Sequence, residues 1–153
     1  MDEREMRAWR LFLEAHARLM TQLEVELREQ TGMPLAWYDV LVQLSEAPDN
    51  RLRMQQLARR VLISKSGLTR LVDRLCAVGY LRREQDPGDG RGTLAVMTTQ
   101  GRDALRKAAP FHLVGVERAF TDRLSARDAT VLGDTFQRIL DGLEGSEPRR
   151  AAS

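Results

Sequence analysis

Residues 54–98 read MQQLARRVLISKSGLTRLVDRLCAVGYLRREQDPGDGRGTLAVMT, and this stretch decides the fold. Its first half predicts two helices, over 54–61 and from about 64 to 78, joined by a short turn. One side of the second helix is an apolar stripe. The other side mixes short hydroxyls with cations: Ser64, Lys65, Ser66, Thr69, Arg70 and Arg74. Hydroxyls and arginines on one narrow helix face suit DNA phosphates and base edges.

The second half of the stretch predicts a β-hairpin. Residues 80–85 and 93–98 have the composition of strands, and in the latter Leu94 and Val96 alternate with Ala95 and Met97. The loop 86–92 holds three glycines and a proline, which are turn-forming residues. Two helices followed by a glycine-tipped hairpin are typical of a winged helix-turn-helix.

Amphipathic segments precede this stretch. Apolar residues at steps of three and four predict one helix over 3–30, which Gly32 and Pro34 end. A second helix is predicted over about 36–46, and residues 51–53 suit a very short strand. The inward residues of the second helix are expected to be Trp37, Val40, Leu41 and Leu44.

Further helices are predicted after the hairpin. A helix begins at Thr98 or Thr99, Pro110 kinks or interrupts it, and residues 111–124 continue as helix. Ser125 and Asp128 have the spacing of a capping box and open a last helix. Its apolar side carries Leu132, Phe136, Ile139, Leu140 and Leu143. Residues 147–153 are expected to form a disordered tail.

The expected fold is mainly α, with a winged helix-turn-helix core and dimerisation helices at both ends. The expected domains are an N-terminal dimerisation helix (1–34), a DNA-binding winged domain (35–98) and C-terminal dimerisation helices (99–146). The winged core can bury its own apolar residues with little help from the rest of the chain. The terminal helices nevertheless carry broad apolar stripes. Because packing on a second copy of the chain buries these stripes, a homodimer is expected.

Charge is concentrated in one segment of the chain. The formal net charge is only +2, but residues 51–92 hold ten basic and four acidic side chains, a net charge of +6. Residues 1–50 hold five basic and ten acidic side chains, a net charge of −5. A concentrated basic segment favours double-stranded DNA as a partner. A solvated basic face is the alternative.

Several other classes of protein are disfavoured. Hydrophobic residues make up 42% of the chain, but no run approaches the roughly 20 apolar residues that span a bilayer. The charged N-terminus lacks a signal-peptide pattern, so a cytoplasmic protein without a membrane partner is expected. With no Gly-rich phosphate loop, Gly-x-Ser-x-Gly or metal-ligand spacing, neither an enzyme nor a metal site is expected. The single Cys76 excludes an intrachain disulfide and is interpreted as a small buried hydrophobe.

The ordered motifs resemble the MarR family of bacterial winged-helix regulators over nearly the whole chain. The sharpest parts are LARRVLISKSGLTRLVDRL (57–75), GYLRR (79–83), DPGDGRG (86–92) and VMTTQG (96–101). The resemblance implies a homodimeric, ligand-responsive repressor that binds an inverted repeat. Two rival functions remain: a ligand-insensitive architectural DNA binder, and a winged-helix module that binds other proteins.

The resemblance also implies roles for single residues. The hydroxyls and cations of the second helix would contact the major groove, Arg91 would reach into the minor groove, and Asp89 would support the wing. The alternatives are a surface ion pair with Asp73 for Arg70 and Arg74, and simple turn residues for Asp89 and Arg91. Two departures stand out. Position 90 is glycine where the family often has arginine, so wing contacts would be fewer. Ala36 replaces the usual Ser or Thr cap, so its helix would start loosely.

Effectors of this family, small anionic or aromatic molecules, bind between the dimerising helices and the winged domain. The residues that would line such a cleft here are Trp9, Phe12, His16, Trp37, Tyr38, Asp39, Phe111 and His112. A plain aromatic core is the alternative. Asp39 beside two aromatic residues, the Ser-Gly-Leu-Thr-Arg helix and the Asp-Gly-Arg-Gly wing resemble the urate-responsive subgroup.

Overall fold

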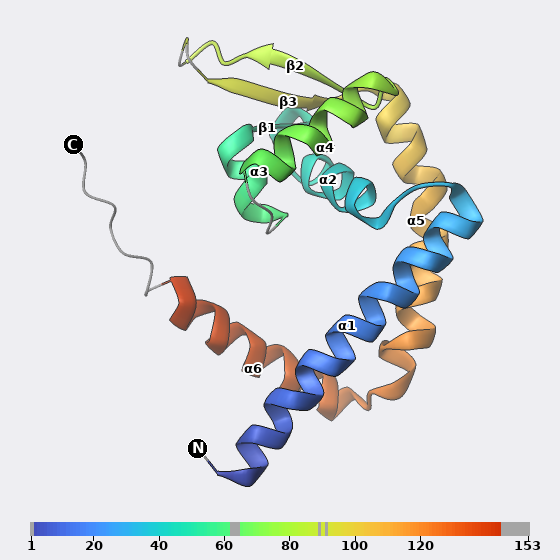
Figure 1. Ribbon diagram of the computed structural model, residues 1–153, viewed down its shortest axis with the longest axis vertical. Helices are drawn as coiled ribbons and strands as arrows, with labels where there is room; N and C mark the ends of the chain where they lie inside the picture. The colour runs from blue at the N-terminus through green and yellow to red at the C-terminus, as the bar shows by residue number, and fades with distance from the viewer. Residues whose placement is uncertain (1, 62–64, 89, 91, 145–153) are drawn as a thin grey trace, which may run out of the picture. The chain divides into compact units, whose positions relative to one another are not determined.

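The computed structural model forms two compact units, residues 1–115 and 116–153, which are described separately below. The described residues are 2–61, 65–88, 90 and 92–144. In chain order the elements are α1 (Glu3–Thr31), α2 (Leu35–Ser45), η1 (Pro48–Asn50), β1 (Arg51–Arg53), α3 (Met54–Arg60), α4 (Lys65–Ala77), β2 (Leu81–Gln85), β3 (Thr93–Met97), α5 (Thr99–Ala119), η2 (Thr121–Arg123) and α6 (Ala126–Glu144) (Figure 1). The expected mainly α fold with a winged helix-turn-helix core is confirmed.

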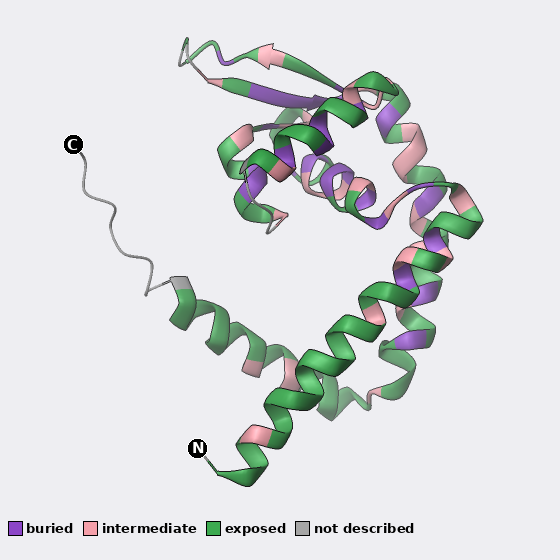
Figure 2. Cartoon of the chain, viewed as in Figure 1, coloured by how far each residue is buried: buried purple, intermediate pink, exposed green. Residues whose placement is uncertain are grey.

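The core of the winged domain lies where α2, α3 and α4 meet the small sheet, and Figure 2 shows its buried residues. Each of these helices contributes leucines or valines at helical spacing, and these side chains are almost fully buried. They include Val40, Leu41, Leu44, Leu57, Leu68, Val72 and Leu75. The apolar stripe predicted for α4 therefore faces inward, apart from its last member, Val78, which is 40% exposed just beyond the helix.

The sheet is antiparallel and has the order β1-β3-β2. Leu81 of β2 lies opposite Met97, and Leu52 of β1 lies opposite Ala95. The alternation predicted for β3 is wrong, because all four residues from 94 to 97 are buried. As the central strand, β3 has neighbours on both edges. Its Met97 also lies against Gly101 of α5, so more than one face of the strand is covered.

Helix α2 differs from its prediction in two ways. Tyr38 is 6% exposed and belongs to the core. Trp37, which was expected inward, is only half-buried and meets Tyr80 edge-on at 6.1 Å between ring centroids. The local side-chain cap that Ala36 was expected to lack is indeed absent at the N-cap residue of α2, but the N–H of Leu35 donates to Glu24 Oε2 of α1 at 2.6 Å. The cap comes from another helix, which a local motif cannot reveal.

Helix α5 begins against the end of α4. Thr98 Oγ1 donates to the carbonyl of Gly79 at 2.6 Å and accepts the N–H of Gly101 at 3.0 Å. An added Cβ at Gly101 would lie only 2.2 Å from the Tyr80 carbonyl oxygen. Only glycine permits this approach, so the Thr-x-x-Gly pattern ties α5 to the start of the hairpin.

Pro110 lies inside α5, and the helix is continuous from Thr99 to Ala119. The expected interruption is therefore wrong. The helix predicted over 111–124 is confirmed as far as Ala119, and the 3-10 turn Thr121–Arg123 follows in place of its last residues. Proline cannot bond the carbonyl of residue 106. Residues 106 and 110 are both exposed, so water can satisfy that carbonyl.

The second unit contains the end of α5, η2 and α6. The predicted capping box is confirmed: Ser125 N–H donates to Asp128 Oδ2 at 3.0 Å, and Asp128 N–H donates to Ser125 Oγ at 3.2 Å. The Ser125 hydroxyl also donates to Asp128 Oδ2 at 2.7 Å, and this bond together with the one from the Ser125 N–H lowers the pKa of Asp128. The apolar side of α6 is exposed in the single chain, notably at Val131, Ile139, Leu140 and Leu143. Among the described residues, no helix is long and apolar enough to cross a membrane.

Candidate nucleic-acid interface

Helix α4 has two unlike faces. Leu68 and Val72, at 1% and 0% exposure, anchor one face in the core. The opposite face, called here the polar face of α4, is exposed and consists of Ser66, Thr69, Arg70, Asp73 and Arg74. Packing therefore fixes the rotation of α4 about its axis and directs this set to solvent.

Asp73 is the only acid on this face, and it is paired with an arginine from β2. Its Oδ1 lies 2.5 Å from Arg83 Nη1, and Arg83 Nη2 also donates to the Thr69 carbonyl at 3.4 Å. The alternative in which Asp73 pairs with Arg70 or Arg74 is therefore wrong. Among the described residues, neither Arg70 nor Arg74 has an ion-pair partner.

The arginines of the sheet are paired in the same way. Glu84 contacts Arg82 at 2.5 Å and Arg51 at 3.5 Å, and Asp86 contacts Arg53 at 2.5 Å. Within the described part of the basic segment, four exposed arginines have no ion pair: Arg59, Arg60, Arg70 and Arg74. Free positive charge thus concentrates on the end of α3 and on the polar face of α4. Sequence reasoning counted Arg59 and Arg60 in the charge but did not select them as contacts.

The base of the wing depends on Asp86, which sequence reasoning also missed. Its side chain is buried, its Oδ1 accepts the N–H of Gly88 at 2.9 Å, and its Oδ2 lies 2.5 Å from Arg53 Nε. Its own N–H donates to the Gly92 carbonyl at 2.8 Å and closes the hairpin loop. A signal existed in the sequence, because an aspartate before Pro-Gly is a turn-former.

Several predicted contact residues cannot be placed. Ser64, Asp89 and Arg91 lie outside the described residues, and Lys65 is described only in its backbone as the first residue of α4. Their roles at the groove and at the wing tip stay predictions. Ser66, Thr69, Arg70 and Arg74 are the predicted contacts that the structure brings together on one face.

The predicted effector residues fall into separate groups. Trp9, Phe12 and His16 follow one another along α1, with ring centroids 6.0 and 6.1 Å apart. Trp37 lies against Tyr80 instead. Phe111 is 47% exposed.

Tyr38 of α2 and His112 of α5 form the remaining contact, with ring centroids 4.4 Å apart. Burial lowers the pKa of His112, and its Nδ1 is buried without a hydrogen-bond partner among the described residues. Burial, followed by the nearby charge of Asp39, raises the pKa of Tyr38. Partial burial of the Asp39 carboxyl raises its pKa, although the residue as a whole is exposed.

Two open depressions lie elsewhere on the first unit. One, of about 620 Å³, runs along α1 beside Ala17, Thr21 and Val25. The other, of about 500 Å³, lies at the start of α5 beside Tyr80, Gln100 and Lys107. None of the eight predicted effector residues lines either depression.

Cys76 is half-buried on α4. Burial raises the pKa of its thiol, and the charges of Arg83 and Asp73 act in opposite directions. A raised pKa disfavours the reactive thiolate. In the described ranges, no three His, Cys, Asp or Glu side chains gather as metal ligands would.

An exposed cationic helix beside a hairpin defines the class of winged helix-turn-helix DNA-binding proteins. The sequence profile of the MarR family matches residues 31–92. A MarR family transcriptional regulator from Streptomyces coelicolor, Sco3205, solved in complex with DNA, is 37% identical, with a TM-score of 0.89 over 100% of this chain and 94% of that one. AbsC, a MarR family transcriptional regulator from the same organism, is also 37% identical, with a TM-score of 0.88 over 95% and 98% of the two chains.

Curated relatives agree with these structures. YetL, an HTH-type transcriptional repressor of Bacillus subtilis (strain 168), is 29% identical over 111 residues, which are 71% of this chain and 66% of YetL. YkoM, an uncharacterized HTH-type transcriptional regulator of the same strain, is 29% identical over 119 residues, which are 78% and 75% of the two chains. The chain belongs to the MarR family of transcriptional regulators.

Proposed function

We propose that this MarR-family regulator is a repressor that binds an inverted repeat in a promoter as a homodimer. The polar face of α4 would enter the major groove, with Arg70 and Arg74 on phosphates or base edges. The observation that carries this proposal is the distribution of ion pairs. The sheet arginines are neutralised by acids, while the arginines of α4 have no ion pair among the described residues. Unpaired cations on an exposed helix attract DNA phosphates.

The wing would supply the second contact. Arg91 is assigned to the minor groove on the resemblance of the DPGDGRG loop, where narrow A·T-rich tracts concentrate negative potential. Asp86 supports this assignment, because its buried carboxylate fixes the base of the loop through Gly88 and Arg53.

The homodimer is supported by exposed apolar side chains on the terminal helices. Trp9, Phe12 and Leu13 of α1 are 53%, 42% and 46% exposed, and Ile139 and Leu143 of α6 are 52% and 62% exposed. Large apolar surfaces of this kind mark interfaces in soluble proteins. Two copies related by a twofold axis would present two α4 helices to half-sites about one helical turn apart.

A mobility-shift assay with the chain's own upstream region tests this function. We expect Arg70→Ala and Arg74→Ala each to weaken binding by about 1–3 kcal/mol, which is about fivefold to 150-fold. Arg127→Ala is the matched control, because it removes an exposed arginine of α6 outside the basic segment. Binding should also fall steeply as salt rises.

Other outcomes identify the rival functions. Equal affinity for any duplex would indicate an architectural DNA binder. No binding, or binding that ignores salt, would indicate a protein-interaction module. Sedimentation at micromolar concentration should give the mass of a dimer, and a monomer would overturn the two-site arrangement.

We also propose that a small aromatic or anionic effector binds near Tyr38 and His112. The supporting observation is the buried Nδ1 of His112, which has no hydrogen-bond partner in the described part of the chain. A buried polar atom of this kind is costly unless something satisfies it. The effector would release DNA only if it prefers a dimer with displaced α4 helices, and a full shift needs about 5 kcal/mol of differential affinity.

Thermal-shift and mobility-shift measurements with benzoate, a hydroxybenzoate and urate test this proposal. A ligand should raise the melting temperature of the free protein and weaken its DNA complex. His112→Phe, which keeps a ring beside Tyr38 but removes both ring nitrogens, should lose the response and still bind DNA. An unchanged response in this variant would exclude His112 from the effector site.

A further inference from the structure

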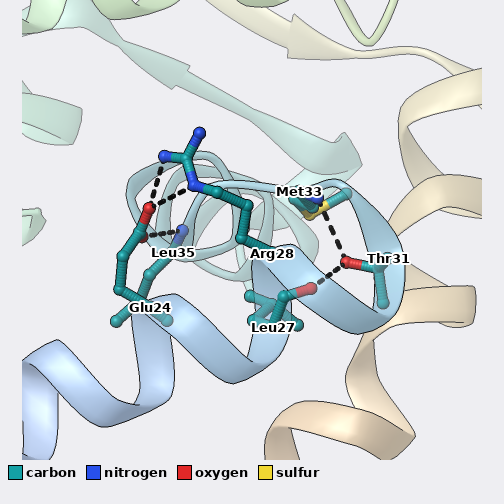
Figure 3. Close-up of polar contacts among 6 residues, drawn as sticks. All are labelled: Glu24, Leu27, Arg28, Thr31, Met33 and Leu35. Carbon is teal, nitrogen blue, oxygen red and sulfur yellow. Dashed lines mark hydrogen bonds and ion pairs between the residues drawn. The ribbon is translucent and has the colours of Figure 1, made fainter.

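The connector between α1 and α2 is short, and its backbone donors are all bound to α1. From residue 32 to residue 35 the chain has three N–H groups, because Pro34 has none. Gly32 donates to the Arg28 carbonyl at 2.8 Å, and Met33 donates to Thr31 Oγ1 at 3.2 Å. Thr31 Oγ1 itself donates to the Leu27 carbonyl at 2.7 Å (Figure 3).

The third donor, Leu35, begins α2 and binds a side chain eleven residues earlier. Its N–H donates to Glu24 Oε2 at 2.6 Å (Figure 3). The N-cap residue of α2, Pro34, makes no side-chain cap. The first turn of a helix needs acceptors for its free N–H groups and favours a negative charge beside them. Glu24 of α1 meets both needs.

Glu24 is itself held in place. Arg28, one turn further along α1, donates from Nε to Glu24 Oε1 at 2.8 Å, so one carboxylate oxygen binds Arg28 and the other binds Leu35 (Figure 3). Partial burial favours the neutral acid. The hydrogen bonds from Arg28 and Leu35 and the charge of Arg28 outweigh it, and they lower the pKa of Glu24. Glu24 is therefore a carboxylate at neutral pH.

We infer that Glu24 is a positioning residue, which fixes the angle between the dimerising helix α1 and the winged domain and thereby sets the half-site spacing that the dimer reads. This inference rests on the proposed homodimer. Helix α1 carries the exposed apolar residues of that interface, and α2 packs against α3, α4 and the sheet. The α1–α2 junction is thus a direct covalent path from the interface to the reading helix.

Small angles matter at such a junction. Half-sites one helical turn apart require the two α4 helices to lie about 34 Å apart. A rotation of the winged domain about the α1–α2 junction carries α4 with it, and a displacement of about 3.4 Å already equals the rise of one base pair. A junction held only by the chain would tolerate such rotations, whereas one held by a charge-assisted hydrogen bond resists them.

The test uses the operator that the mobility-shift assay identifies in the upstream region. It compares duplexes with one or two base pairs inserted or removed between the two half-sites, together with a single half-site. Wild-type protein should lose affinity steeply when the spacing changes. Glu24→Ala should remain a dimer and bind the single half-site like wild type, but its penalty for altered spacing should fall roughly tenfold. Glu24→Gln retains a carbonyl acceptor for Leu35, so it should keep most of the penalty.

Glu29→Ala is the matched control, since it removes an exposed carboxylate from the same helix. Its spacing penalty should equal that of wild type. An unchanged penalty in Glu24→Ala would overturn the inference and leave the proposed function intact. If Glu24→Ala weakened binding to the single half-site as much as binding to the full operator, Glu24 would act through stability only. That result would overturn the inference too. A wild-type protein without any spacing preference would instead contradict the two-site function itself, and the inference with it.

Discussion

Asp73 of α4 and Arg83 of β2 form an ion pair, with 2.5 Å between Oδ1 and Nη1. This pair joins α4 to β2, the first strand of the hairpin. It also neutralises the single acid of the polar face of α4, so that the net charge of this face is positive.

Asp73→Asn should therefore change DNA binding more than stability. Both side chains are substantially exposed, so loss of the pair should alter the free energy of unfolding by less than about 1 kcal/mol. Removing the carboxylate frees Arg83 beside the DNA, and affinity for non-specific duplex should rise. The slope of log affinity against log salt concentration should steepen by about the amount that one phosphate contact contributes. Titrations at several salt concentrations measure this, and weaker non-specific binding would contradict it.

Asp86→Asn should destabilise the wing. The substitution removes the charge that faces Arg53 while it leaves an oxygen for the N–H of Gly88. Because the carboxylate is buried, we expect a loss of about 1–3 kcal/mol in stability by denaturant unfolding. Operator affinity should fall with it. The half-buried Asp103 on α5 also faces an arginine, and Asp103→Asn is the control, which should cost far less.

Gly101→Ala should be strongly destabilising. Its Cβ would lie 2.2 Å from the Tyr80 carbonyl oxygen, a backbone atom that cannot move without shifting α5 from the hairpin. Overpacking of this kind costs about 1–3 kcal/mol or more. Gly133→Ala in α6 is the contrast, because its Cβ would meet no atom within 4 Å. That change should raise stability by about 0.5–1 kcal/mol. The melting temperatures of the two variants, compared with that of the wild type, measure both effects.

Stability should depend on pH through His112. Burial lowers its pKa in the folded protein below the usual 6.5, so the unfolded chain binds the proton more readily. The protein is therefore most stable, as far as His112 is concerned, above pH 6.5, and loses stability as pH falls below that value toward the folded pKa. His112→Phe should remove this part of the dependence in thermal melts between pH 7.5 and about 5. Parallel curves for the two proteins would contradict the burial of His112.

Much of the fold followed from periodicity. Apolar residues at helical spacing predicted α1, α4 and α6, and the glycine-rich loop predicted the hairpin, because each signal is local in the chain. The errors came from burial and exposure in the folded chain, which a local pattern does not specify. Pro110 did not end α5, since the carbonyl it leaves unbonded lies on an exposed turn. β3 did not keep an alternating pattern of exposure, since residues 94–97 are all buried and Met97 lies against Gly101 of α5.

The residues of the candidate site likewise fall into those that local spacing predicted and those that only the folded chain brought together. The sequence by itself determined the family, through its ordered motifs. It also determined which hydroxyls and arginines share the polar face of α4, because helical spacing alone decides which side chains lie on one face. Only the tertiary structure decided which charges remain free. It paired Asp73 with Arg83 and buried Asp86 beside Arg53. It also brought Glu24 to the start of α2. These pairs join residues ten or more positions apart, and the physical reason is general: an ion pair or a cap depends on proximity in space, which spacing along one element does not specify.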